Sequence, residues 1–271
     1  MNDGSPGRFK VQGQIDFAPG NGPRHIAIRG NNFSLLFVTD CLLITTCLLA
    51  LDGILFTVHE KTSRLTIQQL SQGPNDTTLP LIANVSIIPP PPSPNAPFNS
   101  TFAAAELLIS EPSEQFPDPL IYVSNRNLGP DFDPRGDSIA IFEFKQANSS
   151  TTPSSGGEPA DPNATDIPTS TLIRRRLHAR HFSLREVDPG ADPISGINGT
   201  LELQNQVFTG LRQIRSMALG PVDGDGSDEF LVAGANLDGG VAVFRRTQGG
   251  RNLEVVARNT ELPSRTSFVF I

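Results

Sequence analysis

Three stretches of the chain repeat the same succession of short apolar segments, and this repeat restricts the fold more than any other feature. The first reads HIAI, ILFTVHE and RLTIQQL; the second AELLIS, LIYVSNRN and SIAIFEFK; the third RSMALG, EFLVAGAN and GVAVFRR. Each contains an apolar strand, a second strand that ends in polar residues, and a third strand of alternating polarity. Repeats of about 40–50 residues with four short antiparallel strands are typical of β-propeller blades. The sequence therefore predicts an all-β fold.

The predicted strands fall into three sets followed by one further strand. They cover residues 9–17, 25–29, 54–60 and 64–70; 104–110, 120–125 and 138–145; 215–219, 230–233, 240–246 and 253–257; and, as a closing strand, 264–271. The 24 glycines and 24 prolines also favour turns over long helices, because a proline inside a helix breaks it. Residues 1–271 are therefore interpreted as a single partial β-propeller with about three blade cores and long irregular insertions.

Two segments interrupt the repeat. Residues 146–208 form a predicted loop-rich insertion, whose Ser/Pro/Gly/Asp-rich part has too few apolar groups to offset the entropy lost on ordering. Residues 31–53 are instead a nearly unbroken apolar insertion. Three interpretations stay open for it: a retained intron or gene-model error, a buried helix or extra strands, and a membrane span. Asp40 disfavours the span, because an acidic group at mid-bilayer costs about 2.5–3.5 kcal/mol.

Charge and motifs argue against several classes of protein. The net charge of −7 opposes a general nucleic-acid surface, because phosphate binding needs clustered positive charge. The basic run at residues 174–181 is interpreted as a solvated loop. The acidic string at residues 223–229 lacks the order of an EF-hand loop and is interpreted as a hairpin turn. Walker, GxGxxG, HExxH, CxxC and GxSxG motifs are all missing from the sequence, so nucleotide, zinc and serine-hydrolase functions lack support. We predict no cofactor and no metal-binding residues, and a metal requirement stays open.

Seven Asn-X-Ser/Thr sequons indicate glycosylation of a secreted protein. They begin at Asn32, Asn75, Asn84, Asn99, Asn148, Asn163 and Asn198. Sequons are modified only in a chain that enters the secretory pathway, and residues 1–17 lack the apolar core of a signal peptide. We therefore expect an extracellular protein if a signal peptide precedes this sequence, with a cytoplasmic location as the alternative.

Short strings in the first two repeats are similar to those of one known family. GPRHIAI at residues 22–28, FTVHE at 56–60, and AAELLIS followed by YVSNRN within 104–127 resemble the lactonase family of seven-bladed β-propellers. That family includes 6-phosphogluconolactonases and 3-carboxy-cis,cis-muconate cyclases. The resemblance covers the blade cores and implies the C-terminal portion of such a propeller. It implies an enzyme that opens or forms a lactone ring on a small anionic substrate. The alternatives are a secreted, glycosylated binding or surface protein and an inactive truncated product.

The resemblance also implies which residues form the site at the channel mouth. The implied catalytic residues are Arg24, Glu60 and Arg126, and the implied substrate-binding residues are His25, Glu106 and Arg215. Arginine suits an anionic substrate because its planar, permanently charged donors bind carboxylate or phosphate in pairs. The carboxylate of Glu60 would polarise water or move a proton. His59 is expected to pack elsewhere, because neighbouring strand residues point to opposite faces. The sequence does not indicate an oligomeric state.

Overall fold

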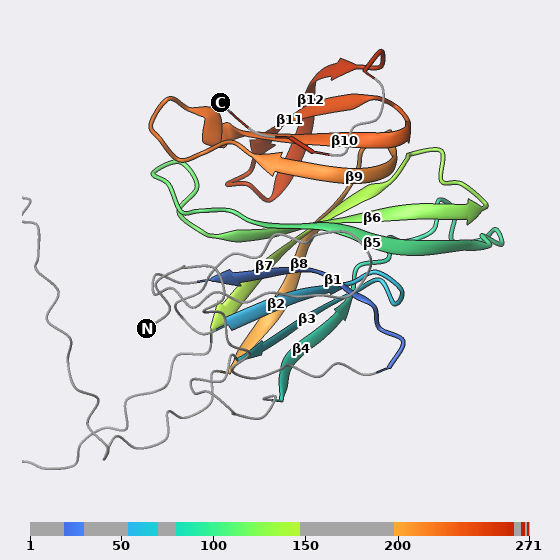
Figure 1. Cartoon of the computed structure of the whole chain (residues 1–271), viewed down its shortest axis with the longest axis horizontal. Coiled ribbons are helices and arrows are strands. Elements are labelled where there is room, and N and C mark those ends of the chain that lie inside the picture. The colour runs from blue at the N-terminus through green and yellow to red at the C-terminus, as the bar shows by residue number, and fades with distance from the viewer. Residues whose placement is uncertain are drawn as a thin grey trace, which may run out of the picture. The chain divides into compact units, whose positions relative to one another are not determined.

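The computed structural model describes residues 19–29, 54–69, 80–146 and 198–262, together with 267, 268 and 270. These residues form three antiparallel sheets of four strands each (Figure 1). The single helical element among them is the three-residue 3₁₀ turn η1 (Ser227–Glu229). The all-β class and the partial propeller that the sequence predicts are thus confirmed.

Each sheet is one blade, with its strands side by side in chain order. The first blade contains β1 (Pro23–Arg29), β2 (Ile54–His59), β3 (Arg64–Gln69) and β4 (Leu81–Ser86). The second contains β5 (Ser100–Ile109), β6 (Leu120–Pro130), β7 (Ser138–Gln146) and β8 (Gly199–Phe208). The third contains β9 (Arg212–Leu219), β10 (Phe230–Asp238), β11 (Val241–Thr247) and β12 (Asn252–Asn259). The first strands of the three blades lie next to one another: β5 of the second blade contacts both β1 of the first and β9 of the third.

Two strands that the sequence analysis did not predict are β4 and β8. Both are the fourth strand of their blade, and most of their side chains are exposed or half-buried. An outer strand buries little apolar surface, so its sequence carries little of the period-two alternation that identifies strands. β8 occupies residues 199–208, the last part of the segment that we predicted to be loop-rich.

Other predictions fall on parts of the chain that the structure does not describe. The predicted strand at 9–17 and the apolar insertion at 31–53 lie outside the described residues, as does most of the closing strand at 264–271. The strands on either side of the insertion are nevertheless paired, with Arg29 of β1 opposite Ile54 of β2. The first blade therefore has the same antiparallel pairing of its first two strands as the other blades.

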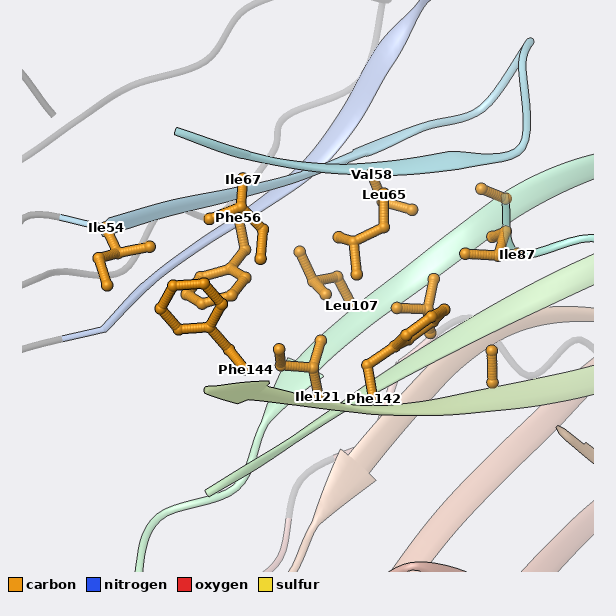
Figure 2. Packing of buried hydrophobic residues seen from close by; sticks show 13 residues of the cluster. Ile54, Phe56, Val58, Leu65, Ile67, Ile87, Leu107, Ile121, Phe142 and Phe144 are labelled. Atoms are coloured by element: carbon orange, nitrogen blue, oxygen red, sulfur yellow. The ribbon is translucent and has the colours of Figure 1, made fainter. Parts of the chain in front are cut away.

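Packing between the first and second blades depends on the alternation of side chains along the strands. Ile121 and Phe142 of the second blade lie with Phe56 and Ile67 of the first blade in one buried cluster (Figure 2). Phe56 also meets Phe144 edge to face, with 5.9 Å between ring centroids and an interplanar angle of 86°. Each fully buried side chain of this size contributes roughly 1.5–3 kcal/mol.

The opposite face of the second blade packs on the third. Leu120, Tyr122, Ile139 and Ile141 alternate with the residues of the first cluster and join Leu211 and other apolar residues of the third blade. Both faces of β6 and β7 are therefore buried, which explains their nearly continuous apolar sequences. This packing fixes the ends of β2 and β6, where the candidate site lies.

Candidate functional site

A β-bulge occurs at the same point in the first strand of each described blade. In β1 the additional residue is Arg24, and in β9 it is Arg215. In β5 the bulge consists of Ala105 and Glu106, which together lie opposite Ser124. A bulge inserts one residue into a strand and re-aims the side chain there. Arg24 and Arg215 therefore occupy equivalent positions in two blades.

The ends of the second strands bring further charged residues to the bulges. Pro23, just before the β1 bulge, lies opposite His59, and Glu60 is the next residue along the chain. The corresponding pair in the second blade is Ala104 opposite Asn125, so Arg126 occupies the position of Glu60. The pairing register thus places one acidic and one basic residue at matching points of adjacent blades.

The Glu60 carboxylate lies between two arginines from different blades. Arg24 Nη1 is 3.0 Å from Glu60 Oε2, and Arg126 Nη2 donates a hydrogen bond to Glu60 Oε1. The side chain of Arg126 is 5% exposed, whereas those of Arg24 and Glu60 are 20% and 32% exposed. The carboxylate therefore has solvent on one side and a buried guanidinium on the other.

The backbone of β5 orients both guanidinium groups. Arg24 Nε donates to the carbonyl of Ala105 at 3.1 Å, and Arg126 Nη2 lies 3.5 Å from the carbonyl of Ala104. Both carbonyls belong to the bulge region of the same strand. Within the described part of the chain, the buried Nε of Arg126 has no hydrogen-bond partner. The first blade thus depends on the second to hold its arginine in place.

The charges in this cluster act on one another. Burial by itself would raise the pKa of Glu60, but the charges and hydrogen bonds of Arg24 and Arg126 lower it below its usual value. Burial lowers the pKa of Arg126, the positive charges of Arg24 and Arg215 lower it further, and Glu60 opposes these effects. Two guanidinium groups contact one carboxylate, and the charge of Arg215 also reaches Arg126, so these groups together carry an excess of positive charge. The cluster is therefore suited to bind an anion while Glu60 stays ionised at neutral pH.

The remaining predicted site residues fare differently. His25 lies in β1, but its side chain is outside the described part of the structure. Glu106 is half-buried in the β5 bulge, and its backbone N–H donates to Ser124 Oγ at 2.9 Å. His59 is fully buried, with its Nε2 2.8 Å from Thr66 Oγ1, as expected for a packing residue. The roles of His25 and Glu106 in substrate binding stay predictions.

Sequence reasoning missed one charged residue near the cluster. Asp137, just before β7, is buried, and its carboxylate accepts hydrogen bonds from the backbone N–H groups of Asn127 and Ile214 at 2.9 and 2.8 Å. These two residues directly adjoin Arg126 and Arg215 in the chain. The available sequence signal was an aspartate directly before the apolar run SIAIF, which by itself indicates only a turn.

None of the His, Cys, Asp and Glu side chains in the described part of the chain gather in a group of three that could hold a metal ion. None of the helical segments among the described residues is long and apolar enough to cross a membrane.

The sequons are partly within the described structure. Asn84, Asn99 and Asn198 are exposed, whereas Asn32, Asn75, Asn148 and Asn163 lie outside the described residues. Exposure makes the first three sites physically accessible to a glycosyltransferase in the folded chain.

Three four-stranded blades whose first strands adjoin define a protein of the β-propeller class. The family model described as "Lactonase, 7-bladed beta-propeller" matches residues 2–161, more than half of the chain. The chain therefore belongs to the lactonase family of seven-bladed β-propellers, which confirms the family that the GPRH, HE and SNR strings predict.

Solved structures with a similar fold are much longer than this chain. One is a protein from Lactobacillus plantarum, with 14% identity and a TM-score of 0.50. The match covers 93% of this chain and 46% of the Lactobacillus protein. Another is the periplasmic gluconolactonase of Pseudomonas aeruginosa, with 14% identity and a TM-score of 0.47. The match covers 92% of this chain and 42% of the gluconolactonase. The chain thus spans less than half of these structures. No curated protein matches the chain.

Proposed function

We propose that this chain contributes to lactone chemistry on a small anionic substrate, and that Arg24, Glu60 and Arg126 form the reacting centre. The observation that carries the proposal is the ionised Glu60 carboxylate held between the two arginines of adjacent blades. Membership of the lactonase family supports the reaction class. The excess of positive charge supports a substrate with a carboxylate or a phosphate.

In the hydrolytic direction, Glu60 accepts a proton from a water molecule that attacks the lactone carbonyl carbon. A bond forms between the water oxygen and this carbon, the ring C–O bond breaks, and the ring oxygen takes the proton that Glu60 received. A guanidinium of the cluster stabilises the negative charge that develops on the carbonyl oxygen. Lactone formation from a hydroxy acid follows the same steps in reverse. Cyclisation of a muconate is a different step: a carboxylate oxygen of the substrate forms a bond to one carbon of its C=C bond, the π bond breaks, and the neighbouring carbon takes a proton from water.

The lowered pKa of Glu60 in the free protein makes it a weak base, but an anionic substrate changes its surroundings. When the substrate's carboxylate or phosphate engages the arginines, part of their positive charge is withdrawn from Glu60. Its pKa then rises toward the working pH, where a general base is most effective. A neutral lactone lacks this effect, so the proposal predicts that charged lactones are the better substrates.

The test is an assay of the full chain with 6-phosphogluconolactone, with uncharged gluconolactone and with 3-carboxy-cis,cis-muconate, after subtraction of the spontaneous reaction. Arg24→Ala is compared with Arg64→Ala, which removes an arginine of the same blade that is bonded to Asn84 instead of Glu60. We expect turnover of an anionic substrate by the wild type and by Arg64→Ala, and at least a tenfold loss in Arg24→Ala. Equal rates for the wild type and Arg24→Ala would overturn the proposal. The proposal would also be overturned if neither protein exceeded the spontaneous reaction.

A further inference from the structure

The buried carboxylate of Asp137 connects the second and third blades directly behind two of the arginines. Its Oδ1 accepts the backbone N–H of Asn127 at 2.9 Å, and its Oδ2 accepts that of Ile214 at 2.8 Å. Asn127 follows Arg126 in β6, and Ile214 precedes Arg215 in the bulge of β9. A single side chain thus fixes the backbone next to one arginine in each of two blades.

The backbone of Asp137 strengthens this connection. Its N–H donates to the carbonyl of Leu211 at 2.7 Å, and its carbonyl accepts bonds from the N–H and the hydroxyl of Thr209 at 2.9 and 2.8 Å. Gln213 Nε2 donates to the carbonyl of Asn127 at 3.2 Å in the same region. The segment that leads into β9 is therefore held at several points to residues 127 and 137 of the second blade.

Such a connection is needed because Arg126 and Arg215 carry the same charge. The positive charge of Arg215 is close enough to lower the pKa of Arg126. Without an anion between them, the two guanidinium groups repel each other and would move apart unless their strands were held. Asp137 holds both strands through uncharged backbone donors and so occupies neither guanidinium group, although that of Arg126 also bonds to Glu60.

We propose that Asp137 is a positioning residue that sets the separation of Arg126 and Arg215, so that arginines of two blades bind one anionic group of the substrate. This inference rests on the proposed function and adds to it the residue that adjusts the anion site. It assigns Arg215 to the substrate's phosphate or carboxylate together with Arg126, which also bonds to Glu60 of the reacting centre, and leaves Arg24 and Glu60 beside the reacting carbonyl.

Removal of the Asp137 carboxylate has opposite expected effects on anion binding, depending on whether its charge or its positioning of the arginines dominates. Loss of a negative charge near Arg126 would by itself strengthen the binding of an anion. Loss of one of the two bonds of the carboxylate would weaken that binding, because the backbone beside one arginine would be released while the backbone bonds of Asp137 remain, and the two arginines would no longer be held at the separation that fits one anion. In Asp137→Asn, one carboxylate oxygen becomes an NH₂ group, which cannot accept the hydrogen bond of a backbone N–H.

The pH provides the second way to break the connection. Burial raises the pKa of Asp137 to about 6, against the lowering effects of its backbone hydrogen bonds and of Arg126. Other charged residues on the elements around it are Arg212 and Arg215 of β9, Asp133 and Arg135 of its own loop, and Arg258, which bonds to the carbonyl of Thr209. Protonation of Asp137 below pH 6 turns one of its acceptor oxygens into a donor.

The experiment measures sulfate binding to the full chain by calorimetry, because sulfate keeps its double charge from pH 5 to pH 8. The matched control is Asp133→Asn, which changes another buried aspartate of the same loop, one that bonds to Arg135 and not to β6 or β9. At pH 7 we expect sulfate to bind at least tenfold more weakly to Asp137→Asn than to the wild type, and within twofold of the wild type to Asp133→Asn. Unchanged or tighter binding by Asp137→Asn would overturn the inference.

Two further readouts keep the outcome clear. If Asp137→Asn does not fold, the wild type alone serves: its sulfate affinity must fall several-fold between pH 7 and pH 5, and a constant or rising affinity overturns the inference. Protonation of a histidine such as His25 would raise the affinity instead, so it cannot produce this fall. With an anionic lactone, the variant should raise KM at nearly unchanged kcat. Sulfate data that follow Asp137 while no lactone is turned over would refute the proposed function and retain the anion site.

Discussion

Arg24 in β1 and Arg215 in β9 occupy the same bulge position in two blades that are separated by the second blade. The second blade has Ala105 and Glu106 in its bulge and contributes its arginine from the second strand, as Arg126. The cluster is therefore built from repeated backbone positions with different side chains. One of these positions carries the carboxylate, Glu60, on which the proposed chemistry depends.

Glu60→Gln should change anion binding and turnover in opposite directions. The substitution keeps the shape of the side chain but removes the negative charge between Arg24 and Arg126. We expect sulfate to bind about tenfold more tightly, which corresponds to about 1.4 kcal/mol. Turnover of an anionic lactone should fall at least about 100-fold, because a general base contributes roughly 10²–10⁴-fold. Glu114→Gln, at an exposed position of the β5–β6 connection, is the control and should change neither quantity.

Arg126→Lys tests whether the geometry of the guanidinium matters beyond its charge. Arg126 donates to Glu60 and approaches the carbonyl of Ala104, and a lysine ammonium cannot reproduce this planar arrangement. We expect kcat/KM for an anionic lactone to fall about 10–100-fold, in line with roughly 1.5–3 kcal/mol for a charge-assisted hydrogen bond. Arg251→Lys, whose arginine bonds to Asp118 and Glu143, should retain the wild-type kcat/KM. A wild-type kcat/KM in Arg126→Lys would show that charge alone suffices.

The interior strands could be predicted from the sequence because most of their side chains are buried. In β6, Ile121 and Tyr122 face different apolar clusters, so both faces are buried and the strand is a nearly unbroken apolar run in the sequence. The outer strands β4 and β8 have mostly exposed or half-buried residues, and nothing in their composition separates them from loops.

The site could be predicted only as far as it resembles a known family or repeats within the chain. Arg24, Glu60 and Arg126 were found because short strings around them resemble the lactonase family, and Arg215 because it begins the matching segment RSMALG of the third repeat. Asp137 was missed because its function depends on its bond to Ile214, 77 residues further along the chain. No local pattern in the sequence encodes a contact between blades.

Tyr122 and Arg246 should be energetically coupled in folding. Tyr122 Oη donates to the carbonyl of Gly250 at 2.7 Å and accepts from Arg246 Nε at 3.0 Å, and the guanidinium of Arg246 lies 3.9 Å from the ring centroid of Phe116. Tyr122→Phe leaves two buried polar groups unpaired, so we expect it to lower the free energy of unfolding by about 1–3 kcal/mol.

Urea unfolding of Tyr122→Phe, Arg246→Met and the double variant measures this coupling. The double variant should lose about 1 kcal/mol less than the sum of the single losses, because each single change removes the same hydrogen bond. Tyr122 lies four residues before Arg126 in β6 and bonds to the third blade, so sulfate binding should stay unchanged in all three variants. Strictly additive losses would show that the two side chains act independently.

Glycosylation can be mapped by expressing the chain behind a signal peptide in yeast. Asn99 lies in an exposed segment just before β5, and Asn198 lies just before β8. Asn84 is within β4, where its Oδ1 accepts a bond from Arg64 Nε at 2.5 Å. We expect higher glycan occupancy at Asn99 and Asn198 than at Asn84, measured by peptide mass after enzymatic release of the glycans. Unmodified peptides at all three sites would remove the argument for an extracellular protein.

The stability of the protein between pH 4 and pH 7 should reflect two buried groups with opposite effects. Burial, aided by the charge of Arg64, lowers the pKa of His59 from 6.5 to about 4. The unfolded chain therefore binds a proton before the folded one does, and up to about 3 kcal/mol of stability is lost as the pH falls from 6.5 to 4. Burial raises the pKa of Asp137 from 3.8 to about 6, so here the folded chain binds the proton first. Up to about 3 kcal/mol is gained as the pH falls from 6 to 3.8.

Because the two effects nearly cancel between pH 6 and pH 4, single variants are needed to reveal them. His59→Gln can keep the bond to Thr66 while removing the titration, so the free energy of unfolding should then rise as the pH falls from 6 to 4. Asp137→Asn should instead lose stability more steeply than the wild type over this range. Urea titrations at pH 4, 5, 6 and 7 measure both slopes. A His59→Gln curve parallel to that of the wild type would mean that His59 does not titrate in the folded protein as its burial predicts.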